Sequence, residues 1–410
     1  MPDLRFTPVD LDSPLFAAWR RTQAAVFLGP YPDEEAVERR RRVADRAARR
    51  TAALDGDAVV ATFVSWDTRV SAPGGAAVAA DAVSGVTVLP THRRRGILTR
   101  MIVPDLADAA GRGVPVAVLI AAEAPIYGRF GFGAATETAR WSVDVRAATL
   151  AAGVPLEGTV EVVPEAGMRA LAPPVFEAAR RPGAIDQHET WWDRGFGLAG
   201  EPDHKQRTWL VHRDRAGRPD GYAGFRPEES WVDRVNRTVA HVGPFQAVTP
   251  AAYAGLWSVL TSLDLVARLD AEELAVDEAL PWLLTDARAA RQAARSDFQW
   301  SRLLDPAAAL SARTYEGPGT TVLRVLDPHG WAAGTYALEA DADGTGACTR
   351  TTAEAQVTLP VDVLSSLWLG GGDLGAAAIA GRAEEHRPGA IARLARLLRT
   401  SRAPWTPTWF

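Results

Sequence analysis

The sequence predicts a mixed α/β (α+β) fold spread over two or three domains. Runs of β-branched, apolar residues alternate with segments whose apolar residues recur at helical spacing. The clearest case is the apolar run 83–88, which leads through the basic turn 93–96 into helical spacing from Ile97 onward. At 410 residues the chain is also too long for one ordinary hydrophobic core.

The first segment, residues 1–150, is expected to form one domain. Asp33 follows Tyr31 and Pro32 and is a candidate N-cap for a helix. Proline stops the second strand at Pro90, and glycine offers a natural helix end at Gly111. The expected elements after the Asp33 helix are strands near 57–70 and 76–89, a helix after Gly96 and a strand at 114–120.

Residues 151–295 are expected to form a second α/β unit, and residues 296–410 a third region. Two arginine- and glycine-containing sequences in the second unit, 180–183 and 218–223, do not join a strand to a helix. The third region is expected to contain strands near 321–326, 331–339 and 346–358 and helices near 361–369 and 388–399.

Two local features of the third region have a specific interpretation. Asp341–Gly344 is predicted to be a hairpin turn rather than a calcium loop, because Thr352 occupies the position of the required glutamate. Pro404 and Pro407 predict an extended tail, since proline disfavours helix at the residue before it. Such a tail is able to reach another domain.

The basic turn at 93–96 is the strongest candidate binding site. The first N–H groups of a helix have no internal partner, and with the helix dipole they form an anion site. Gly96 allows close approach, and Arg93, Arg94 and Arg95 carry guanidinium groups that suit phosphate oxygens. The turn is therefore either a site for a pyrophosphate-bearing cofactor or a solvated basic turn. The missing Gly-Lys-Ser/Thr excludes a P-loop, and the missing second and third glycines exclude a Rossmann fingerprint.

Composition excludes several function classes. The formal charge of −5 argues against a nucleic-acid binder. Cys348 is the only cysteine, so no intrachain disulfide is possible, and the seven histidines lack metal-ligand spacing, so we expect no metal. No apolar run suggests a signal peptide or a membrane span, which predicts a soluble, cytoplasmic protein.

The basic turn resembles the acetyl-CoA loop of the GNAT acetyltransferases, Arg/Gln-x-x-Gly-x-Gly/Ala. Here the loop reads Arg93-Arg94-Arg95-Gly96-Ile97-Leu98, and Leu98 departs from the pattern. Within that superfamily, Pro-Thr-His-Arg-Arg-Arg-Gly followed by two aliphatic residues is usual in the Eis (enhanced intracellular survival) family. The same resemblance continues nearly along the whole chain, through the segments 126–133 and 281–288 and the terminal Trp409-Phe410.

This resemblance implies a fold and an activity. The fold would be a catalytic GNAT domain at 1–150, a degenerate GNAT-like domain without cofactor at 151–295, and a sterol-carrier-protein-like domain at 296–410 whose C-terminal tail enters the active site. The activity would be acetyl-CoA-dependent N-acetylation of a primary amine, which by the family would belong to an aminoglycoside-like substrate. The resemblance also implies a homo-oligomer, a hexamer in the family, and no nucleic-acid partner. A non-enzymatic alternative is a protein that binds CoA or an apolar ligand.

The resemblance also assigns roles to residues. Acetyl-CoA would be bound by Arg93, Arg94, Arg95, Gly96, Ile97 and Leu98, and by a backbone amide of Val86 or Val88 that contacts the oxyanion. Tyr127 would be the acid, because a phenol is protonated at neutral pH and can donate to a thiolate; the residues alone favour an aromatic anchor in a glycine-rich loop. The α-carboxylate of Phe410 would serve as the base or as the partner of the substrate ammonium.

Departures from the family pattern concern the substrate. The segment 24–30 with Phe27 lacks an expected aspartate, and Ser84-Gly85 replaces a serine-aromatic pair. Trp409 stands where an acidic residue is expected. These substitutions predict a pocket that is less acidic and more aromatic than one for aminoglycosides. They favour small or aromatic amines or amino acids as the alternative substrate class.

Overall fold

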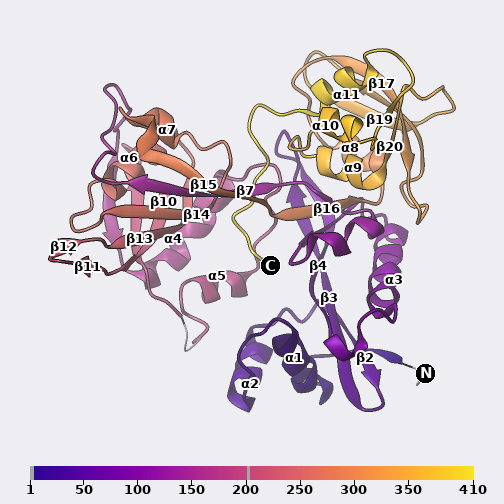
Figure 1. Cartoon of the computed structure of the whole chain (residues 1–410), viewed down its shortest axis with the longest axis horizontal. Coiled ribbons are helices and arrows are strands. Elements are labelled where there is room, and N and C mark those ends of the chain that lie inside the picture. The colour runs from indigo at the N-terminus through magenta and orange to yellow at the C-terminus, as the bar shows by residue number, and fades with distance from the viewer. Residues whose placement is uncertain (1–3, 201–203) are drawn as a thin grey trace. The chain divides into compact units, whose positions relative to one another are not determined.

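The computed structural model describes residues 4–200 and 204–410, which divide into two compact units (Figure 1). Unit 1 comprises the chain up to Thr136, then Phe298–Pro404 and Thr408–Phe410. Unit 2 comprises Glu137–Asp297 and Trp405–Pro407. None of the helices in the described ranges is long and apolar enough to cross a membrane.

A seven-stranded sheet forms the first part of unit 1, in the order β1-β2-β3-β4-β5-β16-β6. β1 to β4 pair antiparallel, and β4 then pairs parallel with β5. The strands are β1 (Arg5–Pro8), β2 (Arg49–Asp55), β3 (Ala58–Ser71), β4 (Ala77–Val88), β5 (Val116–Ile120), β6 (Gly133–Ala134) and β16 (Gln299–Leu303). The predicted strands at 57–70, 76–89 and 114–120 correspond closely to β3, β4 and β5.

Helices pack on both faces of this sheet. They are α1 (Leu15–Val26), α2 (Glu34–Val43) and α3 (Ile97–Gly111). Alternate residues of β2 face opposite sides, so Ala53 packs in one core cluster with α3, while Ala52 and Leu54 pack in another with α1. Asp33 caps α2 as expected, since its Oδ1 accepts from Ala36 N (2.7 Å).

The chain leaves this sheet at Thr136 and returns to it at Phe298. β16 therefore lies between β5 and β6, pairing antiparallel with β5 from Gln299↔Ile120 to Leu303↔Val116. β7 (Glu137–Asp144), which lies within the predicted 1–150 domain, instead pairs in the sheet of unit 2. The crossing at residues 136–137 thus lies before the proposed division at 150, whereas the crossing at residues 297–298 lies within two residues of the proposed division at 296.

Unit 2 repeats the order of elements in the first sheet. Its seven strands run β15-β7-β14-β13-β10-β9-β8, and a single parallel pair, β13 with β14, is again joined through a helix. Its strands beside β7 are β8 (Thr159–Val163), β9 (Thr208–Arg213), β10 (Pro219–Glu228), β13 (Val239–Ala247), β14 (Arg268–Leu274) and β15 (Ala290–Asp297), with the hairpin β11 (Trp231–Val232) and β12 (Val235–Asn236). Its helices are α4 (Glu165–Ala178), α5 (Glu189–Gly195), α6 (Pro250–Leu260) and α7 (Leu280–Leu283).

A five-stranded sheet forms the second part of unit 1, in the order β19-β18-β17-β20-β21. Its strands are β17 (Gly319–Leu326), β18 (Gly334–Ala340), β19 (Gly346–Arg350), β20 (Val357–Pro360) and β21 (Glu384–Glu385). Its helices are α8 (Pro306–Ser311), α9 (Val361–Leu367), α10 (Leu374–Ile379) and α11 (Ala390–Leu398). The predicted hairpin turn at Asp341–Gly344 is confirmed, since Asp341 N donates to Thr345 O (2.8 Å) between β18 and β19.

The predicted single strand at 346–358 is wrong. β19 ends at Arg350 and β20 begins at Val357. Between them Thr351 Oγ1 accepts from Ala353 N (3.2 Å), a local turn that competes with continued strand pairing. As a result β19 pairs with β18, whereas β20 pairs parallel with β17.

Candidate active site

One cavity of about 950 Å³ brings together most of the residues predicted for the site. It is formed by the end of α1, the last residues of β4, the basic turn, the start of α3 and the segment before Tyr127. Among the predicted residues, the lining includes Phe27, Val86, Val88, Arg93, Arg94, Gly96, Ile97, Leu98 and Tyr127.

The start of α3 opens directly into this cavity. Gly96 is the N-cap residue with φ +70°, and no side chain caps the helix. A Cβ on Gly96 would meet nothing within 4 Å, so the backbone is open to a ligand there. Unpaired N–H groups, the helix dipole and the guanidinium groups of Arg93 and Arg94 make this turn fit a pyrophosphate. The predicted strand, basic turn and helix are therefore all present.

Arg95, unlike Arg93 and Arg94, forms an ion pair outside the cavity. Its Nη1 lies 3.6 Å from Asp55 Oδ2, and the same carboxylate is 3.1 Å from His92 Nε2. Asp55 is the last residue of β2, so these contacts fasten the basic turn to the β2–β3 connection. Arg95 is consequently absent from the cavity lining and anchors the turn instead.

The end of β4 separates from β5 beside the cavity. The parallel pairing between these strands ends at Val83↔Leu119, although β4 continues to Val88. The two strands are therefore splayed here, and Val86 and Val88 lie in the cavity lining. Backbone N–H groups at such a position are available to an external acceptor.

Ser84 and Gly85 lie just before this segment and outside the cavity lining. The β3–β4 register shifts between Thr62↔Thr87 and Val64↔Ser84. Gly85 has φ +56°, its carbonyl accepts from Thr62 Oγ1 (2.7 Å), and a Cβ there would lie 2.3 Å from Gln23 Nε2. Glycine at residue 85 thus allows β4 to form a β-bulge that packs closely against α1.

Tyr127 lies on the side of the cavity formed by the segment after β5. It connects the short 3₁₀ turns η2 (Ala124–Ile126) and η3 (Gly128–Phe130), and it is only 7% exposed. Its ring packs edge-on against Phe132 (6.2 Å between centroids). Burial, with a smaller contribution from the charge of Glu123, raises the pKa of Tyr127 to about 12. The phenol therefore remains protonated at neutral pH.

The two terminal aromatic residues contact different parts of unit 1. The Phe410 ring meets Trp66 of β3 edge-on (5.7 Å between centroids, 86°). The Trp409 ring lies 5.5 Å from that of Phe298. Neither is part of the cavity lining, so their predicted roles stay predictions. Trp66 was not identified from the sequence, where nothing links β3 to the chain end.

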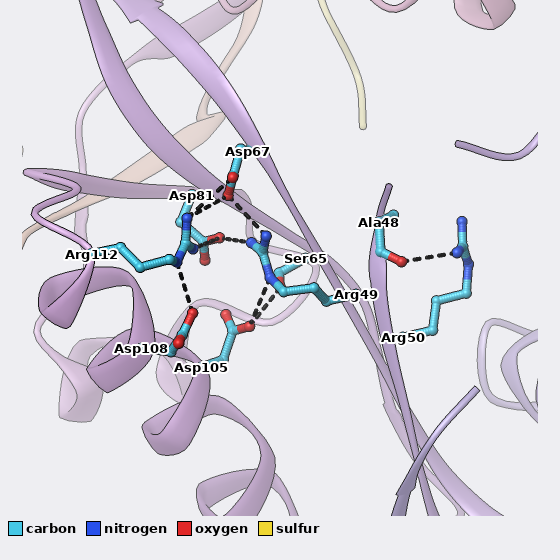
Figure 2. Close-up of polar contacts among 9 residues, drawn as sticks. All are labelled: Ala48, Arg49, Arg50, Ser65, Asp67, Asp81, Asp105, Asp108 and Arg112. Atoms are coloured by element: carbon cyan, nitrogen blue, oxygen red, sulfur yellow. Dashed lines mark hydrogen bonds and ion pairs between the residues drawn. The ribbon is translucent and has the colours of Figure 1, made fainter. Parts of the chain in front are cut away.

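A network of charged side chains anchors the far half of α3 to the sheet (Figure 2). Asp81 of β4 is fully buried and pairs with Arg49 of β2, and it lies 3.8 Å from the guanidinium of Arg112. Ser65 Oγ donates to Asp105 of α3 (2.5 Å). Burial, and then the nearby Asp105 carboxylate, raises the pKa of Asp81 to about 9 despite both arginines. We call Arg49, Asp81, Asp105 and Arg112 the α3 anchor.

The helix between the parallel strands of unit 2 lacks an open N-terminus. Thr249 Oγ1 accepts from Ala252 N (3.1 Å), and Pro250, the first residue of α6, has no N–H. Thr249 also donates to the Asp220 carboxylate (2.7 Å), which places an acidic group beside this helix end. Such a terminus is unsuited to an anion.

Among residues 4–200 and 204–410, no three His, Cys, Asp or Glu side chains are grouped so that they could hold a metal ion.

Comparison with known proteins agrees with this architecture. Residues 11–135 and 183–321 each match a family described as an acetyltransferase (GNAT) domain, and residues 306–407 match a sterol carrier protein domain. The chain is 36% identical over 332 residues to the N-acetyltransferase Eis of Mycobacterium tuberculosis, covering 78% of each chain. It is 42% identical over 405 residues to an uncharacterized N-acetyltransferase of Streptomyces griseus, covering 96% of this chain and 97% of the other.

A solved structure has the same overall arrangement of domains. The crystal structure of Eis1 from Mycobacterium abscessus aligns with a TM-score of 0.84 and 28% identity over 100% of both chains. The predicted fold class, two tandem GNAT domains followed by a sterol-carrier-protein-like domain, is confirmed. GNAT acetyltransferases take their acetyl group from acetyl-CoA, which the open turn at Gly96 fits. The chain belongs to the Eis family of GNAT N-acetyltransferases.

Proposed function

We propose that this acetyltransferase modifies the primary amine of a small or aromatic molecule, with Tyr127 as proton donor and the Phe410 α-carboxylate as partner of the amine. The observation that carries the proposal is a cavity that contains both the open N-terminus of α3 and Tyr127 in its lining. Acetyl-CoA, when bound, supplies the activated acetyl thioester. The N–H groups at the start of α3, with Arg93 and Arg94, would hold its pyrophosphate.

The remaining residues have complementary roles in this proposal. A backbone N–H of Val86 or Val88 would donate to the acetyl carbonyl oxygen as negative charge develops there. Tyr127 Oη would hold the proton that the leaving sulfur requires. The Phe410 carboxylate, ionised at neutral pH, would attract and orient the substrate ammonium.

The charge of the lining supports a substrate with one amine. Among the described lining residues Glu123 is the single carboxylate, and Arg129 is a cation in addition to Arg93 and Arg94, which the proposal assigns to the pyrophosphate. A polycationic aminoglycoside would need several carboxylates to balance its ammonium groups. Trp66 of β3 and Phe410 at the chain end, which lie outside this lining, form an aromatic pair that would suit a flat, apolar substrate body.

The substrate proposal is tested by CoA release from acetyl-CoA across a panel of amines. Tyramine and tryptamine would represent aromatic monoamines, with lysine, spermidine and neomycin as aliphatic and polycationic competitors. We expect the highest kcat/KM with an aromatic monoamine. A preference for neomycin or spermidine would contradict this substrate class while leaving the acetyltransferase activity intact.

The role of the Phe410 carboxylate is tested with two variants of the chain end. Deleting Phe410 removes the ring and moves the carboxylate, whereas adding one glycine after Phe410 keeps the ring and moves only the charge. If the carboxylate orients the amine, both variants raise the amine KM or lower kcat. Full activity of the glycine extension would contradict this role.

Gly96→Ala is expected to raise the KM for acetyl-CoA about 10-fold, because a methyl group would occupy the space that a phosphate approaches and weaken one charged hydrogen bond. Its cost in stability should be only about 1 kcal/mol, from the left-handed backbone. Gly113→Ala is the matched control, since Gly113 has φ +77°, equally open surroundings and no place in the cavity. Equal changes of KM in the two variants would contradict the proposed cradle.

A further inference from the structure

A fully buried ion pair lies beneath the turn that carries Tyr127. Arg302 comes from β16, and Asp327 follows directly after β17. Their side chains are both 0% exposed, and Arg302 Nη2 lies 2.7 Å from Asp327 Oδ2. The pair thus connects the seven-stranded sheet to the five-stranded sheet of the same unit.

Arg302 also bonds to the Tyr127 turn itself. Its Nε donates to the carbonyl oxygen of Phe130 (2.8 Å). The N–H of Phe130 in turn donates to the carbonyl oxygen of Tyr127 (3.0 Å). Gly131 has φ +87°, and a Cβ there would lie 2.5 Å from Arg302 Nε. The turn therefore packs so closely on the guanidinium that only glycine fits at residue 131.

Asp327 shapes a second contact to the same turn. Its carboxylate accepts backbone N–H groups from His329 (3.1 Å) and Ala332 (2.9 Å). The loop after β17 is thereby folded so that the His329 ring stacks on Phe130, with 6.3 Å between centroids and 24° between planes. His329 also stacks on Trp331 (5.1 Å between centroids), whose ring centroid lies 5.3 Å from the Arg302 guanidinium.

We propose that Arg302, Asp327 and His329 form a positioning group that sets the location of Tyr127 Oη during acetyl transfer. The five-stranded domain then contributes to catalysis through this group as well as through the chain end. Because these residues hold the backbone of the turn and the neighbouring ring, their loss should misplace the phenol while leaving the α3 cradle intact. The inference rests on the proposed role of Tyr127 as proton donor.

The first test compares steady-state kinetics of His329→Ala, Asp327→Asn and Arg302→Gln with the amine that gives turnover. We expect kcat to fall on the order of 10-fold with the KM for acetyl-CoA within about twofold, since a displaced proton donor slows chemistry without weakening binding. Arg313→Gln is the matched control. Arg313 is 2% exposed and donates to the carbonyl oxygens of Trp368 and Leu398, away from the turn. His329→Ala, which removes no buried charge, remains informative if the Arg302 variant fails to fold.

The second test separates positioning from a general loss of stability. In a Tyr127→Phe background, His329→Ala should produce no further loss of kcat, because the group it positions is absent. Amide hydrogen exchange in residues 126–132 should accelerate in His329→Ala but not in Arg313→Gln. Additive losses of kcat in the double variant would overturn the positioning group. Unchanged amide exchange in His329→Ala, Asp327→Asn and Arg302→Gln would overturn it as well. Full activity of Tyr127→Phe would instead overturn the role of Tyr127 as proton donor. The hydrogen-exchange measurement would still show whether the positioning group holds the backbone of residues 126–132.

Discussion

Tyr127→Phe is expected to lower kcat about 10²–10⁴-fold while leaving the KM for acetyl-CoA within about twofold, the range typical of losing a general acid. The substitution removes only the hydroxyl, so the edge-on packing against Phe132 is retained. Because burial and Glu123 raise the pKa of Tyr127 to about 12, the phenol stays protonated across the accessible pH range. Its deprotonation should therefore not limit kcat between pH 6 and 10.

The measurement is kcat against pH for the wild type, Tyr127→Phe and Tyr315→Phe. Tyr315 is a matched control, since it is also buried and its hydroxyl donates to the Leu310 carbonyl oxygen (2.7 Å) in the five-stranded domain. Tyr315→Phe should lower stability without lowering kcat per folded enzyme. A Tyr127→Phe variant with wild-type kcat would show that the leaving sulfur receives its proton elsewhere.

The strand, turn and helix around Gly96 were predictable because every signal in them is local. Apolar alternation ends at Pro90, the basic turn follows, and helical spacing begins at Ile97. Gly96 adopts the positive φ that a glycine before a helix permits. Every cofactor-binding residue predicted from this segment except Arg95 lies in the cavity lining, whereas the lining residues Thr87, His92 and Thr99 were not predicted. Arg95 was misplaced because its pairing with Asp55 depends on a neighbouring strand connection.

The sheets to which β7 and β16 belong were not predictable from the local sequence pattern: β7 pairs in the sheet of unit 2, and β16 pairs in the seven-stranded sheet of unit 1. β7 and β16 have ordinary strand signals, and such signals do not state which strand lies alongside. Only the folded chain brings Gln299 opposite Ile120 and Glu137 opposite Asp297. The division proposed at 150 therefore lies after β7, although the chain crosses into unit 2 between β6 and β7.

Buried polar partners were equally hidden in the sequence. Arg302 and Asp327 are separated by a helix and a strand, and Asp81 meets Arg49 from another strand of the sheet. From the sequence alone, each of these charged residues is expected to lie on the surface. The burial of Arg302, Asp327 and Asp81 becomes visible only when each charge and its partner are brought together, which explains why the sequence identified Tyr127 but not the residues that hold its turn.

Asp81→Asn is expected to remove a loss of stability that grows with pH in the wild type. The unfolded chain releases the Asp81 proton near pH 4, whereas the folded chain retains it up to about pH 9, because Asp81 is buried beside Asp105. Between these values the folded state binds more protons than the unfolded state. The free energy of unfolding therefore falls by about 1.4 kcal/mol per pH unit for this group, and below about pH 4 the group contributes no such penalty.

Urea unfolding midpoints measured at pH 6, 7, 8 and 9 test this expectation. An amide at residue 81 can still accept from Arg49 and donate to Asp105, so the α3 anchor keeps its contacts without an ionisable group at its centre (Figure 2). The gain in stability over the wild type should increase steadily with pH. Asp108→Asn is the matched control, because Asp108 bonds to Arg112 (2.8 Å) from an exposed position. Parallel pH profiles for Asp81→Asn and the wild type would mean that Asp81 is ionised in the folded protein, and that Arg49 and Arg112 together outweigh its burial.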